Sequence, residues 1–123
     1  MKSLLTVVVL GLTTLLASAA EPSVTGHQKI EGVYKIYGGG LGDEVMPTAK
    51  DKKVMFALQG GAARQIFDAI GPDVKDACTE GSGTRVRHKD HENIFCSRSK
   101  EGEYACNFGF DLVTGKSIGG IIC

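Results

Sequence analysis

Histidine and carboxylate side chains gather in the most polar segment of the chain, His88-Lys89-Asp90-His91-Glu92. His88 and His91 are candidate metal ligands, because imidazole and carboxylate groups bind transition-metal ions. A site built on them would allow a small metal-dependent hydrolase. The same residue types are typical of an exposed hairpin tip, and the positive charge of Lys89 opposes a bound cation. We therefore expect no metal and no other cofactor, with the histidine pair as the alternative.

Basic side chains alternate just before this segment. Arg85, Arg87 and Lys89 are two residues apart, so in a strand they share one face. Arg98 is expected to join them from the neighbouring strand. A face of this kind can bind an anionic group or a partner protein, and it is equally typical of an ordinary solvated strand.

Two tyrosines form a further candidate recognition site. Tyr34 and Tyr37 lie beside the glycine-rich run 38–42, and tyrosine is favoured at binding surfaces because its ring is rigid and amphipathic. Packing in the core or at a sheet edge explains both residues equally well. The glycine run does not indicate a phosphate site, because Asp43 and Glu44 follow it and would repel an anion.

Motifs for catalysis are absent from the sequence. The chain contains no G-x-S-x-G nucleophile elbow and no H-E-x-x-H zinc motif. The run Thr114-Gly115-Lys116-Ser117 is similar to the end of a P-loop, but Gly109 stands one residue too far away for the required glycine spacing. The sequence therefore favours a binding protein over an enzyme, and we expect no catalytic residues.

Four cysteines lie in the C-terminal part of the chain, and their even number predicts two disulfides in an exported protein. None of their spacings is the C-x-x-C typical of redox and zinc sites. A hairpin turn at Gly102 would set Cys96 opposite Cys106, whereas a turn at residues 114–115 would set Cys123 opposite Cys106. The favoured pairs are Cys78–Cys123 with Cys96–Cys106, and the alternative pairs are Cys78–Cys96 with Cys106–Cys123.

The first twenty residues are typical of a secretory signal peptide. Lys2 precedes an apolar run over residues 4–16, and small residues fill positions 17–20. Cleavage after Ala19 or Ala20 fits this pattern. The apolar run is shorter than the roughly 20 residues that a membrane span needs. We expect export to the periplasm or the medium, with no stable membrane insertion after cleavage.

The elements that must position these side chains can be read from hydrophobic periodicity. One helix is predicted over residues 62–70, where Ala63, Ile66, Phe67 and Ile70 form an apolar stripe, and Gly71 is expected to end it with a positive φ. Strands are predicted on both sides of this helix. Their ranges are 32–37, where the glycine run should end the strand, then 54–58, 84–89, 93–99, 103–112 and 117–123, with residues 43–53 irregular.

These elements predict an α+β fold: a small antiparallel sheet with one short helix packed on one face and two disulfides. The sheet would consist of a four-stranded C-terminal meander and one or two N-terminal strands. Residues 21–31 are expected to be a flexible lead-in, and residues 32–123 a single domain.

Charge and composition limit the function of this domain. Fourteen Lys and Arg residues balance 14 Asp and Glu residues, which argues against a general nucleic-acid binder. We expect a non-catalytic binding module, such as an inhibitor or immunity-type partner of another envelope protein. The alternative is a structural or stress-related envelope protein without a specific ligand. The sequence leaves the oligomeric state open.

Overall fold

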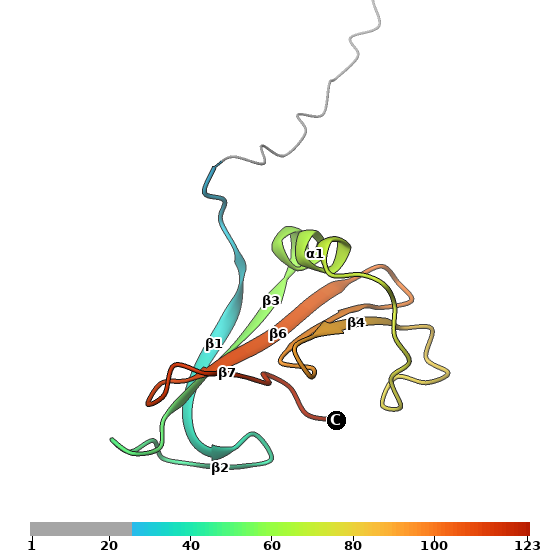
Figure 1. Cartoon of the computed structure of the whole chain (residues 1–123). Coiled ribbons are helices and arrows are strands. Elements are labelled where there is room, and N and C mark those ends of the chain that lie inside the picture. Colours follow the sequence, from blue (N-terminus) through green and yellow to red (C-terminus); the bar gives the residue numbers. More distant parts are fainter. Residues whose placement is uncertain (1–25) are drawn as a thin grey trace, which may run out of the picture.

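The computed structural model describes residues 26–123 (Figure 1). The expected signal peptide and residues 21–25 of the expected lead-in lie outside these residues. The described part forms one helix and seven strands. In chain order they are β1 (Glu31–Gly40), β2 (Asp43–Val45), β3 (Lys53–Gln59), α1 (Gly60–Ala69), β4 (Arg85–Lys89), β5 (Ile94–Arg98), β6 (Tyr104–Asp111) and β7 (Ser117–Ile118).

All seven strands belong to one antiparallel sheet, in the order β2-β1-β3-β6-β5-β4, with β7 paired to β6. The predicted α+β fold is therefore confirmed. Strands β4, β5 and β6 form the predicted meander, and the Gly102 turn between β5 and β6 has the expected positive φ, at 89°. The long central pair β3–β6 joins this meander to the N-terminal strands, which number three because β2 forms within the segment expected to be irregular.

The last strand is much shorter than the predicted range 117–123, because β7 contains only Ser117 and Ile118. β3 pairs with one edge of β6, and β5 occupies residues 104–107 of the other edge, so β7 is confined to the remaining end of that edge, where it pairs with Gly109 and Phe110. The predicted pairing of Cys123 with the position of Cys106 in the sheet is consequently wrong. The chain beyond β7 instead runs as an irregular tail.

The glycine run does not end the first strand, contrary to the sequence-based expectation. β1 continues through Gly38, Gly39 and Gly40, which pair with Val45, Glu44 and Asp43 of β2. Glycine keeps the backbone N–H and C=O groups that a ladder needs, and β2 supplies their partners. These glycines also allow close packing, since a Cβ at Gly38 would lie 2.9 Å from the carbonyl oxygen of Met46.

The core lies between α1 and one end of the sheet (Figure 1). Ala63 and Phe67 of the predicted apolar stripe are fully buried against Leu58, Cys96 and Cys106. Ile66 and Ile70 are partly buried beside them. The helix is thus held by its packing on the sheet, as a helix of only ten residues must be.

The helix begins two residues earlier than predicted and ends at Ala69, with Ile70 as its C-cap. The predicted left-handed Gly71 is wrong, because the positive-φ glycines among the described residues do not include it. Arg87 explains the difference: its Nη1 donates a 2.8 Å hydrogen bond to the carbonyl oxygen of Phe67. A carbonyl of the last turn is therefore satisfied by a side chain rather than by a glycine motif.

Both favoured disulfides are confirmed. Cys96 and Cys106 lie directly opposite each other on β5 and β6 and form a cross-strand bridge beneath α1. Cys78 is bonded to Cys123, which ties the C-terminal tail to the segment between α1 and β4. The two bridges cross-link the C-terminal half of the molecule covalently.

Candidate binding surface

The face of the sheet that carries α1 is only partly covered by the helix. Residues directly opposite one another in neighbouring strands share a face, so Leu58, Cys106, Cys96 and Arg87 form one row under or beside α1. A ten-residue helix is about 15 Å long, whereas the ten residues of β1 extend over about 33 Å. The end of this face away from α1 is therefore left uncovered.

Aromatic side chains occupy the uncovered end. Tyr34 of β1, Phe56 of β3 and Phe108 of β6 lie opposite one another, and Phe110 follows two residues further along β6. Their ring centroids are 6.4 Å, 5.2 Å and 6.2 Å apart in that order. We call these four residues the aromatic row. Its two ends are open to solvent, because Tyr34 is 68% exposed and Phe110 is 40% exposed.

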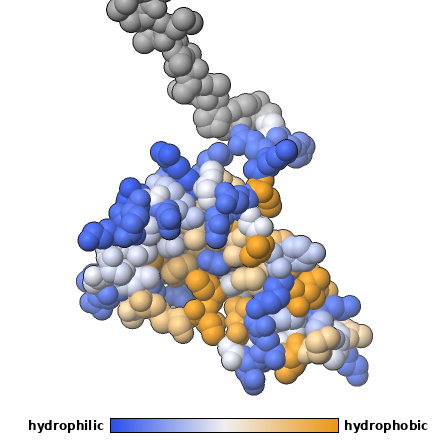
Figure 2. Space-filling model, turned by 180° about the vertical axis from the view of Figure 1, so that it is seen from behind, coloured by the Kyte–Doolittle hydropathy of each residue, from blue (hydrophilic) through white to orange (hydrophobic). Residues whose placement is uncertain are grey.

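One further apolar side chain, Ile36, extends this exposed surface toward the same end of the molecule. Ile36 is 50% exposed and pairs with the buried Val54, which in turn pairs with Phe110. Seen from behind, the molecule shows its apolar residues gathered in the lower half of the view, with polar residues above (Figure 2). Contiguous exposed apolar surface of this kind marks interaction sites in soluble proteins.

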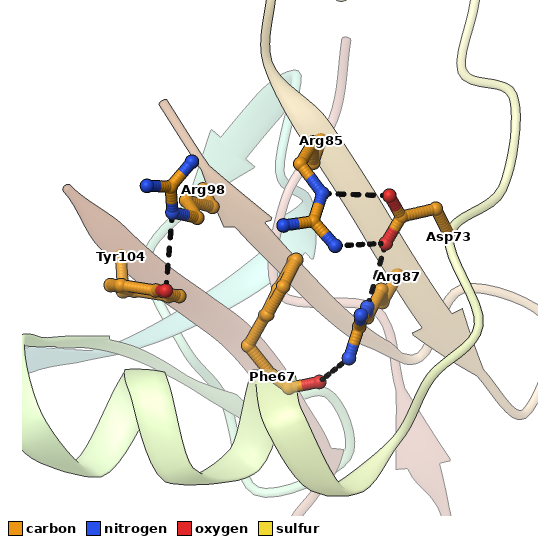
Figure 3. Close-up of polar contacts among 6 residues, drawn as sticks. All are labelled: Phe67, Asp73, Arg85, Arg87, Arg98 and Tyr104. Atoms are coloured by element: carbon orange, nitrogen blue, oxygen red, sulfur yellow. Dashed lines mark hydrogen bonds and ion pairs between the residues drawn. The ribbon is translucent and has the colours of Figure 1, made fainter. Parts of the chain in front are cut away.

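The predicted basic residues lie on the same face, beside the helix, but two of them share one acid (Figure 3). Asp73 accepts hydrogen bonds from Nε and Nη2 of Arg85, at 2.7 Å and 3.2 Å, and from Nε of Arg87, at 2.7 Å. These contacts lower the pKa of Asp73 to about 2. Both guanidinium groups also lie over the ring of Phe67, with Arg87 the closer at 4.2 Å.

Arg98 has a different partner and keeps its charge available. Its Nε donates a 3.1 Å hydrogen bond to the hydroxyl of Tyr104, and its guanidinium lies 5.8 Å from the centre of that ring. Arg64 of α1 approaches the same ring at 5.9 Å. The structure therefore brings Arg85, Arg87 and Arg98 together around two aromatic rings (Figure 3).

The basic residues outnumber their acidic partners on this face. Arg64 forms an ion pair with Asp68 at 3.9 Å, and Asp73 forms ion pairs with both Arg85 and Arg87. Lys89 is exposed at the end of β4, and no ion pair involving it is found within residues 26–123. With Arg98, these five basic residues share two carboxylate partners, Asp68 and Asp73, while Glu31 and Glu103 line the pocket beside Arg64 and Tyr104.

The two candidate tyrosines are separated by the sheet. Neighbouring side chains along a strand alternate between faces, so Tyr34 lies on the helix-bearing face and Tyr37 on the opposite one. Tyr37 is only 4% exposed, and burial raises the pKa of its hydroxyl above the usual value. Tyr34 therefore lies on the exposed surface, whereas Tyr37 is buried among its neighbours.

The two candidate metal-binding histidines do not converge. His88 lies 3.9 Å from the carboxylate of Glu92, whereas His91 is 98% exposed at the tip of the β4–β5 hairpin beside Asp90. Asp90, His91 and Glu92 all have positive φ, between 53° and 72°. Across residues 26–123 no group of three or more His, Cys, Asp or Glu side chains could hold a metal ion.

The sequence patterns did not single out Phe56, Phe108 or Phe110 as surface residues. The alternation of Phe108 and Phe110 with residues of the other face is that of a strand packed against a helix, and it correctly predicts the face. Phe56 belongs to the short apolar run 54–58, which is typical of a buried strand. The available signal was the length of the helix, which is too short to cover every apolar position of β6. Asp73, the acid that pairs with two arginines, follows Gly71-Pro72 in a loop and carried no recognisable pattern.

Comparison of the chain with models of protein families, with curated proteins and with solved structures found no match. Within the described part of the chain, no helix has both the length and the apolar character needed to cross a bilayer.

Proposed function

We propose that the protein is an exported, non-catalytic binding module that docks a partner protein of the cell envelope on its helix-bearing face. The aromatic row carries this proposal. Phe108 of this row packs against the core, but the exposed rings at its two ends, Tyr34 and Phe110, cost solubility. Aromatic side chains of this kind dominate the energetics of protein interfaces.

The partner that fits this face has an apolar centre surrounded by acidic groups. The aromatic row supplies the apolar contact, and the basic residues beside α1 supply the surplus of positive charge. Lys89 and Arg98 are the cations without a carboxylate partner on this face, and complementary charge steers a partner and sets its orientation. The partner class is therefore an acidic protein surface with exposed apolar side chains.

Rigidity supports binding as the role of this face. The Cys96–Cys106 bridge lies under α1, and the Cys78–Cys123 bridge holds the tail. A preformed surface loses little conformational entropy when a partner binds. A small domain whose core contains few residues also gains stability from such bridges.

Photo-crosslinking in the producing organism would identify the partner. A benzophenone analogue of phenylalanine placed at Phe110 is expected to capture one protein, while the same analogue at Met46, an 83% exposed residue outside the aromatic row, is expected to capture none. The captured protein is then purified and its affinity measured by calorimetry.

Substitutions test whether the captured protein binds this face. Phe110→Ala is expected to weaken binding by about tenfold or more, and Met46→Ala to leave it unchanged. Lys89→Glu is expected to weaken binding more at low salt than at high salt, because salt screens exposed charges. Equal affinities for Phe110→Ala and Met46→Ala, or the absence of any Phe110 crosslink, would refute the proposal.

A further inference from the structure

The outer edge of β1 is the longest unpaired strand edge among the described residues. Residues 31–37 pair with β3 on one side, whereas β2 covers the other side only at residues 38–40. Figure 1 shows β1 at the margin of the sheet, with only the short β2 beyond it. An edge of this length presents a row of unpaired N–H and C=O groups that can accept another strand.

Four apolar side chains on this edge are open to solvent, and they alternate with the charged residues Glu31 and Lys35. Ile30 is 65% exposed, Val33 and Tyr34 are each 68% exposed, and Ile36 is 50% exposed. Natural edge strands are usually protected by proline, bulges or inward-pointing charges. Residues 31–37 contain no proline, and their charged side chains, Glu31 and Lys35, are of opposite sign. A strand that sets opposite charges beside these two residues can therefore cover the edge.

We propose that a second copy of this chain covers this edge, by antiparallel pairing of β1 with β1 about a two-fold axis at Val33. Residues opposite each other in an antiparallel ladder point their backbone groups either both toward the partner strand or both away from it, so such an axis passes through a residue and not between two residues. With Val33 on the axis, Glu31 lies opposite Lys35 of the second copy. The other pairs are Ile30 with Ile36 and Gly32 with Tyr34.

This register sets opposite charges beside each other and also covers the exposed apolar side chains of the edge. The two Glu31–Lys35 pairs bring opposite charges side by side, and cross-strand pairs of opposite charge are stabilising. Every exposed apolar residue of the edge meets an apolar residue or glycine. An axis at Tyr34 would instead set Val33 opposite Lys35 and Glu31 opposite Tyr37. Lys35 would then keep only the ion pair with Glu44 of its own chain, and Glu31 would face no cation of the second copy.

The neighbouring elements also leave room for this register. With the axis at Val33, strand β2 of the second copy would lie beside residues 26–28. In that segment Gln28 accepts a 3.4 Å hydrogen bond from Gln65 of α1, and Gly26 and Gln28 line a pocket together with Gly61 and Gln65, so this segment borders the helix. An axis at Tyr34 would bring β2 against residues 28–30, including Ile30.

The dimer joins the two helix-bearing faces into one surface. The two-fold axis stands perpendicular to the sheet, because residues opposite each other in a ladder share a face. Because each aromatic row runs across the strands from β1 to β6, the rows of the two copies would meet at their Tyr34 ends. A single strand pair gives a small interface, so the dissociation constant is expected in roughly the micromolar range.

Sedimentation tests the dimer without any partner protein. The full chain is expressed with export to an oxidising compartment, and the product with both native disulfides is purified. It is expected to shift from monomer to dimer with rising concentration. Val33→Lys, which places two like charges on the axis, is expected to weaken dimerisation by about tenfold or more, and Val45→Lys, at a 55% exposed valine of β2, to leave it unchanged.

Cysteine crosslinking tests the register. Val33→Cys is expected to crosslink with itself, and a mixture of Glu31→Cys and Lys35→Cys is expected to crosslink although neither variant does so alone. A chain that stays monomeric up to about 1 mM would overturn the dimer, and self-crosslinking of Tyr34→Cys would overturn the Val33 axis. Neither result would affect the Phe110 crosslink, so this inference and the proposed function fail separately.

Discussion

Asp73 shows how one side chain shapes the binding face. It lies in the loop after α1 and holds Arg85 and Arg87 in fixed positions beside Phe67 (Figure 3). Arg87 in turn binds the carbonyl oxygen of Phe67, where a cation also interacts favourably with the helix dipole. A single carboxylate therefore orients two cations and links β4 to the end of the helix.

Asp73→Asn removes the ion pairs to Arg85 and Arg87 and is expected to lower the free energy of unfolding near neutral pH. The loss is expected to be only about 1 kcal/mol, because solvent screens these half-exposed ion pairs. The pKa of Asp73 falls from 3.8 to about 2 in the folded protein, so its contribution is present above about pH 4. This contribution is lost as the pH falls through about 2, because the carboxylate is then protonated in the folded state as it already is in the unfolded state. Urea unfolding of both proteins across this range measures the difference, and a difference that persists at pH 2 would contradict this cause.

Helix α1 and the C-terminal tail are both positioned by contacts with the sheet rather than by their own sequence. The helix has no acidic residue in its first turn, no basic residue in its last turn and no side-chain N-cap bond. Phe67 and Ala63 anchor it on the Cys96–Cys106 bridge. The tail is held by Cys123 and by a close contact between Gly120 and the backbone of Phe108.

Phe67→Ala is expected to lower the free energy of unfolding by about 3–5 kcal/mol, because it removes the largest fully buried side chain of the helix. Asp68→Ala, at the exposed neighbouring position, is expected to change it by less than about 0.5 kcal/mol. Urea unfolding followed by circular dichroism measures both. Similar values for the two variants would mean that α1 does not depend on its packing.

Gly120→Ala is expected to destabilise the protein by about 1–3 kcal/mol. A Cβ at Gly120 would lie 2.5 Å from the backbone nitrogen of Phe108, whereas a Cβ at Gly119 would meet nothing closer than 3.9 Å. Gly119→Ala is therefore a matched control with little expected effect. Equal melting temperatures for the two variants would show that the tail is not packed against β6.

Across the whole molecule, the two disulfides compensate for a small core. The buried apolar residues of the described part are few, and Cys96 and Cys106 are among them. Cys78 and Cys123 are 45 residues apart, and Cys96 and Cys106 are 10 apart. Closing such loops in the unfolded chain stabilises a protein by about 4 and about 3 kcal/mol. These values are large against a total stability of about 5–15 kcal/mol.

Cys106→Ser is expected to prevent the protein from accumulating in an oxidising compartment, because it breaks the bridge, frees Cys96 and places a hydroxyl in a fully buried site. The double variant Cys78→Ser/Cys123→Ser is expected to fold with stability lowered by about 4 kcal/mol. Yields and urea midpoints of the purified proteins measure both. Normal yield of the Cys106 variant would contradict the role of this bridge.

Export of the protein can be tested separately from its disulfides. The product collected outside the cytoplasm is expected to lack residues 1–19 or 1–20, because a signal peptidase cleaves after small residues. Intact-mass measurement distinguishes the two cleavage sites. A product that still begins at Met1 would contradict the assignment of a signal peptide.

The sequence by itself determined the elements and their chemistry. Alternation predicted β5 and β6 to within a residue of their ends, the apolar stripe predicted the buried face of α1, and hairpin register favoured the correct cysteine pairs. These features follow from local periodicity and from short loops, which are encoded by neighbouring residues. The alternating Arg85 and Arg87 were predicted to share one face, on which they lie together.

Only the tertiary structure decided what is covered and what is left open. Whether Phe110 is buried depends on how far α1 reaches across the sheet, and whether the edge of β1 is paired depends on the length of β2. The extent of β7 depends on the space that β5 leaves on β6. Each of these is a contact between segments distant in the chain, so no local pattern encodes it. The candidate surfaces of this protein, the aromatic row and the outer edge of β1, are the parts of the sheet that α1 and β2 do not reach.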